Sequence, residues 1–144
     1  MPDWSEQAVQ DYLGRLPRDF EVTLRPIRAE PRRQQPVARL LQAESVRLRE
    51  ALALADRVIA LDERGADWTT ERLARQIDGW RGASEHVAFV IGGPDGLADS
   101  IKSSADLLLR LSSLTLPHAL ARVMLAEQLY RAWSILANHP YHRA

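Results

Sequence analysis

The last seven residues of the chain, NHPYHRA at positions 138–144, are unusually rich in side chains that can do chemistry. His139 and His142 carry imidazoles, whose pKa near neutrality lets them take up or release a proton. Tyr141 adds a phenol, and Arg143 adds a guanidinium, which binds phosphate and other oxyanions. Chain ends are usually frayed, yet this one contains a proline that fixes the backbone. The composition predicts that the carboxyl end is part of a site.

A second candidate is the glycine-rich turn VIGGPDG at residues 90–96, which follows a run of apolar residues typical of a buried strand. Glycine lets the backbone approach a ligand closely or adopt a positive φ. Ligands of parallel sheets bind just beyond the carboxyl ends of the strands. The turn does not match the dinucleotide pattern G-x-G-x-x-G and lacks the lysine of a P-loop. Alone it is a weak signal, because many strands end on glycine.

The third candidate is a short polar loop between a predicted strand and a predicted helix. Its hydroxyl side chains and backbone offer hydrogen-bonding groups to a nucleoside-like ligand, and its leucines offer apolar contact. A connecting loop with a hydrophobic plug has the same composition, so the residues alone leave both interpretations open. The loop consists of Leu111, Ser112, Ser113, Leu114, Thr115 and Leu116.

The elements that must position these segments alternate between helical and strand patterns, which indicates an α/β fold with a parallel sheet. Apolar residues at helical spacing predict helices at residues 3–15, 37–55, from 69 or 70 through Trp80, 97–105 and 117–138. Alternating or continuous apolar residues predict strands at 20–27, 57–62, 86–93 and 106–112. We expect the strand at 86–93 to be central, a polar loop at 28–36 and another at 63–68.

The last predicted helix is apolar on more than one face. Its polar residues Glu127, Arg131, Ser134 and Asn138 follow one another at steps of four, three and four, so they form a single narrow stripe. A helix that lies on one sheet needs only one apolar face. The simplest partner for a second face is another copy of the chain, and we therefore favour a homodimer over a helix buried within its own domain.

Composition limits the remaining possibilities. A chain of 144 residues suits a single domain, which we place at residues 1–144. The sequence contains no apolar run long enough to span a membrane and no cysteine, which fits a reducing cytoplasm. Its 19 basic and 19 acidic residues balance, which argues against a surface that binds nucleic acid everywhere. A local cluster of arginines at residues 25–39 fits phosphate binding, although a base bias in the genome would produce the same excess of arginine.

Three segments together closely resemble the ribosomal large subunit methyltransferase H family: IGGPDGL, LSSLTLPHALARVMLAEQLYRAWSI and the terminal HPYHR. The resemblance covers essentially the whole chain, from MPDW to the final arginine. It implies a SPOUT-type fold with a deep trefoil knot in the C-terminal half. It also implies a cytoplasmic homodimer that uses S-adenosylmethionine to methylate N3 of a pseudouridine in the helix-69 loop of 23S rRNA on the assembled ribosome.

The resemblance also assigns roles to individual residues. It implies that Leu61 packs on the adenosine of the cofactor, that Gly93 lets the backbone approach it, and that the loop at 111–116 closes the pocket. It places the carboxyl end beside the methyl donor, across the dimer. We hypothesise that His142 or Tyr141 orients or deprotonates the base while Arg143 holds a phosphate or the imide oxygen. Solvent is the alternative base, with the enzyme supplying mainly proximity.

Several alternatives remain at this stage. His118 is either a further polar group of the site or a helix-packing residue, and three histidines (His118, His139 and His142) are too few signals to predict a metal site. A non-catalytic, homodimeric RNA-binding protein would also explain the arginines and the apolar helix, but it would need no cofactor pocket. Family members begin with a strand and a glycine turn ahead of the stretch that aligns with MPDW. The resemblance therefore implies that residues 20–27 lack a neighbouring strand in this chain.

Overall fold

A three-stranded parallel sheet forms the centre of the protein. The computed structural model describes residues 3–27, 35–93 and 95–143. The strands are β1 (Arg57–Asp67), β2 (Val87–Val90) and β3 (Leu107–Arg110), in the order β2-β1-β3. In the register of the sheet Ile59 lies opposite Phe89 on one side and Leu107 on the other. Parallel pairing requires long crossover connections, and helices α3 and α4 lie in those connections.

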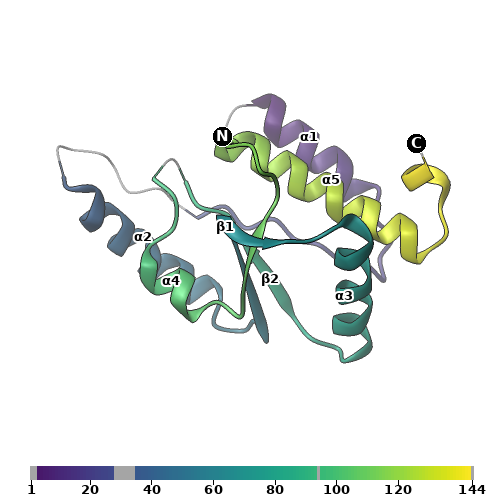
Figure 1. Cartoon of the computed structure of the whole chain (residues 1–144), viewed down its shortest axis with the longest axis horizontal. Coiled ribbons are helices and arrows are strands. Elements are labelled where there is room, and N and C mark those ends of the chain that lie inside the picture. Colours follow the sequence, from purple (N-terminus) through teal and green to yellow (C-terminus); the bar gives the residue numbers. More distant parts are fainter. Residues whose placement is uncertain (1–2, 28–34, 94, 144) are drawn as a thin grey trace.

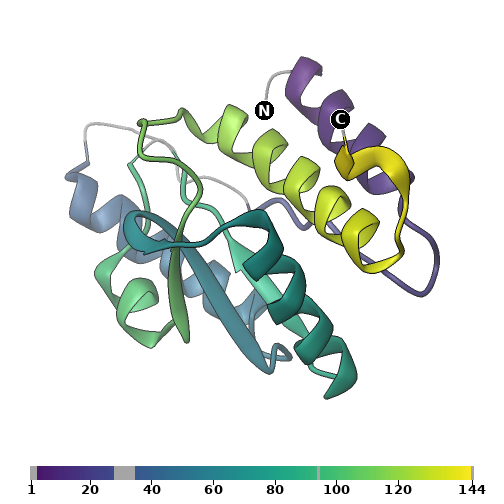
Figure 2. The same cartoon turned by 45° about the vertical axis from the view of Figure 1, so that its right-hand side comes forward.

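Helices cover both faces of the sheet (Figures 1 and 2). Successive side chains of a strand point to opposite faces, so Ile59 and Leu109 join one apolar cluster while Ala60 and Leu108 join another. The first cluster includes side chains of α3 (Thr70–Gly82) and α5 (His118–Leu136), and the second includes side chains of α2 (Val37–Ala51) and α4 (Asp99–Ser104). The chain therefore forms a three-layered α/β domain.

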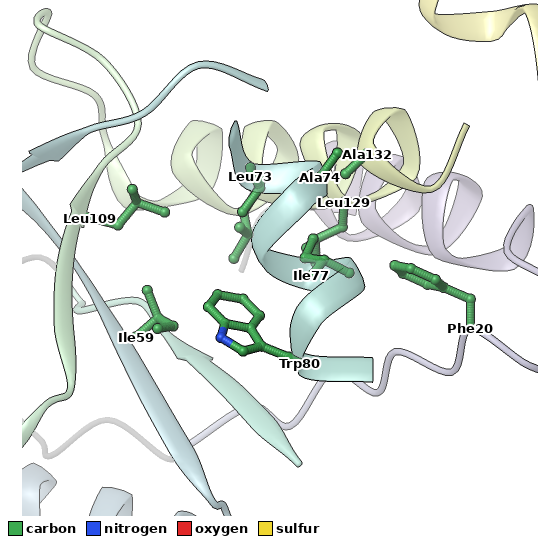
Figure 3. Packing of buried hydrophobic residues seen from close by; sticks show 10 residues of the cluster. Phe20, Ile59, Leu73, Ala74, Ile77, Trp80, Leu109, Leu129 and Ala132 are labelled. Atoms are coloured by element: carbon green, nitrogen blue, oxygen red, sulfur yellow. The ribbon is translucent and has the colours of Figure 1, made fainter. Parts of the chain in front are cut away.

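The first cluster is the larger core and contains most of the aromatic packing. Figure 3 shows Trp80 of α3 beside Ile59 of β1, with Leu129 of α5 at the far side of the helix. The rings of Trp80 and Phe89 meet edge to face, with 6.2 Å between their centroids. This geometry is a preferred one for aromatic pairs. The cluster fixes α3 and α5 on the face of the sheet where the chain later ends.

Helix α1 (Asp3–Gly14) lies alongside α5 (Figures 1 and 2). Val9 of α1 is only 2% exposed, and the rings of Tyr12 and Tyr130 lie 6.2 Å apart. The second apolar face of α5 therefore has a partner within the same chain. This removes the argument for a homodimer from the composition of α5, and the homodimer stays a prediction.

Most elements occur where the sequence predicts them. All five helices are present, and α3 begins as expected after Thr69, whose hydroxyl accepts a hydrogen bond from the backbone N–H of Arg72 at 3.1 Å. The helix predicted to run to residue 55 ends at Ala51, and the last helix begins after Pro117, which stands at the N-cap position. The loop predicted at 28–36 falls largely outside the described residues.

Two strand predictions are wrong. Residues 20–27 form no strand, and β2, expected to be central, lies at an edge of the sheet, where β1 takes the central place. Both errors have one physical cause, because a strand needs a neighbour for its backbone hydrogen bonds. A cleft of about 1140 Å³ lies between residues 20–27 and β2. The alternation along 20–27 favoured a strand, but the segment has no pairing partner among the described residues, as the family resemblance implied.

Strand β1 is also longer than predicted, since residues 63–67 of the expected loop continue it. Leu61 and Ala66 both lie opposite Leu109, so the intervening residues form a bulge in the strand. A Cβ atom at Gly65 would lie 2.6 Å from backbone atoms of Leu108 and Leu109. Only glycine permits β1 to return to β3 after this bulge.

Candidate functional site

The three loops predicted to hold a cofactor leave the same edge of the sheet. Because the strands are parallel, their carboxyl ends lie together. Leu61 lies opposite Leu109 within the sheet, Leu111 directly follows the end of β3, and Gly93 follows the end of β2 by three residues. Leu61 and Leu111 are half-buried against the larger core. The fold thus brings these separate segments of the chain to one edge.

The glycine turn after β2 is tight, and its glycines differ in what they require. A Cβ at Gly92 would lie 2.5 Å from the backbone of Gly96, and Gly96 itself has a φ of +79°. The N–H of Gly96 donates to the carbonyl of Gly93 at 3.0 Å, which closes the turn. At Gly93, by contrast, no atom of the described residues beyond its chain neighbours lies within 4 Å of the Cβ position. The space beside the Gly93 backbone is open and can receive a ligand.

The loop after β3 is compact at its start and exposed further on. The N–H of Leu114 donates to the hydroxyl of Ser112 at 2.9 Å, which forms a local turn. Ser113 and Thr115 are exposed, and the side chain of Leu114 is 76% exposed. Such an exposed leucine is available for contact with a ligand or with another protein surface. Leu116 is half-buried where the loop enters α5.

The large cleft beside β2 is a different feature from this edge. Gly93 and His118 line it, but Leu61 and the loop at 111–116 do not. His118 is half-buried as the first residue of α5. It therefore stands at the opposite end of α5 from the other two histidines considered above. Among the described residues no group of three or more His, Cys, Asp or Glu side chains is placed to hold a metal ion.

The carboxyl end is ordered because of the way α5 terminates. Asn138 adopts a left-handed conformation with a φ of +54°. The N–H of His139 then donates to the carbonyl of Ser134 at 2.8 Å, and that of Asn138 donates to the carbonyl of Ile135 at 3.3 Å. These are the two hydrogen bonds of a Schellman motif. The motif turns the chain back along α5, where residues Pro140–Arg143 form the short helix η1.

The polar stripe of α5 holds the returning tail. Ser134 lies 3.0 Å from Nδ1 of His142, and the guanidinium of Arg143 donates to the side-chain oxygen of Asn138 at 3.1 Å. Arg131, paired with Glu127 at 2.6 Å, lies 5.0 Å from the centre of the Tyr141 ring. The stripe is evident in the sequence, but its function is not. Three of its four residues contact a polar residue of the tail, and Glu127 holds Arg131.

Aromatic packing adds to these polar contacts. The ring of Tyr141 lies 4.6 Å from that of Tyr130, and the ring of His139 lies 5.3 Å from that of Trp133. Burial and a hydrogen bond with Tyr12 raise the pKa of Tyr141 to about 12. The phenol is therefore protonated at neutral pH. Tyr141 can orient a substrate through hydrogen bonding, but its protonation state does not suit it to act as a base.

The tail and the loop at 111–116 lie at opposite ends of α5 (Figures 1 and 2). The loop leads into the first turn of the helix, whereas η1 packs against its last turns. A helix of 19 residues is about 28 Å long. The fold thus gathers the loops predicted to hold a cofactor at one place and His142, Tyr141 and Arg143 at another.

The described fold and loops define an α/β domain that can hold a ligand at the carboxyl edge of a parallel sheet. A sequence profile described as "Predicted SPOUT methyltransferase" matches residues 1–142. The chain belongs to this family of methyltransferases.

Relatives with assigned names agree with this membership. The chain is 54% identical over its whole length to the ribosomal RNA large subunit methyltransferase H of Bordetella avium, covering 93% of that protein. It is 53% identical to the protein of the same name from Methylibium petroleiphilum, with 99% of this chain and 92% of the relative covered. The protein of that name from Paraburkholderia xenovorans is 51% identical, with the same coverage. Within the described residues, no helix is long and apolar enough to cross a membrane.

Proposed function

We propose that this protein transfers a methyl group from S-adenosylmethionine to N3 of a pseudouridine in the helix-69 loop of 23S rRNA, on the assembled ribosome in the cytoplasm. Membership of a methyltransferase family and the names of its relatives support the reaction and the class of substrate. The observation that carries the proposal is the docked tail, which holds an imidazole, a phenol and a guanidinium together in an ordered arrangement. The same membership supports a trefoil knot in the C-terminal half.

The carboxyl edge of the sheet fits the cofactor. When bound, S-adenosylmethionine supplies an electrophilic methyl group on a sulfonium. Leu61 and Leu111 offer apolar contact to its adenosine, and the open space beside Gly93 admits it close to the backbone. The remaining residues of the pocket are those of the loop that follows: Ser112, Ser113, Leu114, Thr115 and Leu116. The absence of a phosphate-binding pattern agrees with a ligand that carries no phosphate.

The tail supplies the groups that act on the nucleotide. N3 of pseudouridine carries a proton and becomes nucleophilic when that proton leaves. His142 accepts the proton through its ring, and Tyr141 orients the base as a hydrogen-bond donor because it stays protonated. Arg143 is exposed, and its guanidinium stabilises the developing negative charge on the imide oxygen or holds a phosphate. If solvent removes the proton instead, the His142→Ala variant will keep the wild-type turnover.

A homodimer joins the two halves of the site. Residues 137–142 span at most about 20 Å even when fully extended, which is less than the length of α5. The tail therefore meets the cofactor loops of a second copy. In a two-fold symmetric pair the two α5 helices can run in opposite directions, which places the end of one beside the start of the other. Trp4, Leu114 and Leu120 are exposed apolar residues in α1, the loop and α5 that such a contact would cover.

The test is transfer of labelled methyl to ribosomes that lack the modification. The full chain is compared with a chain truncated after Asn138. We expect label in 23S rRNA with the full chain and a loss of transfer on truncation. The alternative, a non-catalytic RNA-binding homodimer, predicts ribosome binding without binding of S-adenosylmethionine. Calorimetry with the cofactor alone separates the two, and a failure to bind it would refute the proposed reaction.

A further inference from the structure

Ser134 is the tail-binding residue whose contacts restrict the positions of protons most. It lies near the end of α5 and its exposure is 0%. Its hydroxyl oxygen is 2.9 Å from the backbone carbonyl of Arg131 and 3.0 Å from Nδ1 of His142. A serine hydroxyl has a single proton to donate. At a site this buried, the assignment of that proton decides the state of the imidazole.

Only one arrangement of protons makes both short contacts into hydrogen bonds. If the hydroxyl donates to the carbonyl of Arg131, its oxygen accepts a proton from Nδ1–H of His142. If it donates to Nδ1 instead, the hydroxyl oxygen and the carbonyl oxygen face one another at 2.9 Å as two acceptors. Two acceptor oxygens this close repel one another in a buried site when no proton lies between them. The first arrangement is therefore the stable one.

We propose that Ser134 is a positioning residue that holds the proton of neutral His142 on Nδ1 and leaves the lone pair on Nε2. The inference rests on the proposed function for its role in catalysis: a base needs a ring nitrogen without a proton, and this arrangement leaves Nε2 of His142 in that state. The arrangement also survives the reaction, because the imidazolium still donates from Nδ1 to the same hydroxyl. No side chain has to turn when the proton arrives at Nε2.

The direct test is the ¹⁵N NMR spectrum of the imidazoles in the full chain, at a pH where they are neutral. The signals of His142 are assigned by their loss in His142→Gln. We expect Nδ1 of His142 to show the shift and coupling of a protonated nitrogen and Nε2 those of an unprotonated one. In Ser134→Ala we expect a mixture of the two tautomers. Finding the proton on Nε2 in the wild-type protein, or an unchanged tautomer in Ser134→Ala, would overturn the inference.

A matched control separates this effect from a general loss of stability. Ser45 in α2 is 2% exposed, and its hydroxyl donates to the carbonyl of Gln42, also three residues earlier, at 2.7 Å. Ser45→Ala removes the same kind of buried hydrogen bond far from the tail. It should leave the His142 signals and the rate of methyl transfer unchanged. An altered His142 tautomer in Ser45→Ala would mean that helix stability, and not the contact with Ser134, governs the ring.

Kinetics give a second readout. General base catalysis is worth about 10²–10⁴-fold. Because Ser134→Ala keeps the imidazole, we expect a smaller but measurable fall in kcat, of about tenfold, while KM for S-adenosylmethionine is unchanged. The NMR result does not depend on catalysis. A wild-type protein without methyl transfer would refute the proposed function and leave the tautomer to be judged by NMR. A wild-type rate in Ser134→Ala, with the tautomer altered as expected, would refute the contribution of Ser134 to the reaction.

Discussion

A site shared between two copies can be tested with purified heterodimers. One protomer is truncated after Asn138 and so lacks the groups of the tail. The other carries Gly93→Leu, which places a side chain in the space proposed for the cofactor. The leucine is expected to be tolerated by the fold, because no described residue beyond the chain neighbours lies within 4 Å of the Cβ position and only Gly96 among the described glycines has a positive φ. Each variant alone should be inactive as a homodimer.

The rate expected of this heterodimer follows from the length of α5. Since the tail cannot span a helix about 28 Å long, the proposed site would use the loops of one protomer and the tail of the other. In the heterodimer of the two variants, one site combines the intact loops with the intact tail, and the other combines both defects. We expect about half of the wild-type rate per dimer.

The control is a heterodimer of the wild-type protomer with one that carries both changes. Here each shared site contains one defect, so the expected rate is near background. A site built within one chain predicts the reverse result: near background for the two single variants, and about half of the wild-type rate for this control. Differential tags allow both heterodimers to be isolated before methyl transfer is measured. The reverse result would refute the shared site and the argument from helix length.

Three further predictions concern stability and ionisation. Gly65→Ala should lower the free energy of unfolding by about 1–3 kcal/mol, because its Cβ would overlap the backbone of β3. Gly79→Ala in α3 should raise the free energy of unfolding by up to about 1 kcal/mol, because no described residue outside the helix lies within 4 Å of its Cβ position. Equal urea midpoints for the two variants would contradict this. The raised pKa of Tyr141 stabilises the fold below pH 10, by about 3 kcal/mol at most, and this stability is lost as the pH rises through about 12. Phenolate absorbance should show that late titration, and Tyr12→Phe should move it to lower pH. A chain extended at its amino end by the short strand and glycine turn that the family resemblance implies should melt at a higher temperature, because residues 20–27 would gain a neighbouring strand; equal melting temperatures would count against it.

The parts of the fold that the sequence predicts are those encoded locally. Helix α3 is an example, since Thr69 caps it and Leu73, Ile77 and Trp80 recur at helical spacing. Residues 20–27 show the limit. Their alternation is as regular as that of a strand, but a strand forms only with a neighbour, and pairing is a property of distant segments. The place of β2 in the sheet was missed for the same reason.

The candidate site also has features that the sequence shows and features that only the folded chain shows. The types of residue in the tail and the glycine turn after β2 were evident from the sequence. The docking of the tail was not, because it depends on the left-handed backbone of Asn138, which reverses the chain and sets His142 against Ser134. Asparagine tolerates that conformation better than most residues. The bulge of β1 was hidden as well, since Gly65 resembles an ordinary loop glycine in the sequence.

The aromatic cluster at the end of α5 gives the protein a built-in optical reporter. All three tyrosines of the chain belong to it, and Tyr130 stacks on Trp133 with 5.5 Å between the ring centroids. At such separations an excited tyrosine passes its energy to tryptophan, so tyrosine emission from the docked chain should be weak. Tyr141 alone among the three would move away if the tail left α5. Tyrosine fluorescence of the unlabelled protein can therefore follow the docking of the tail in real time, during cofactor binding or on the ribosome.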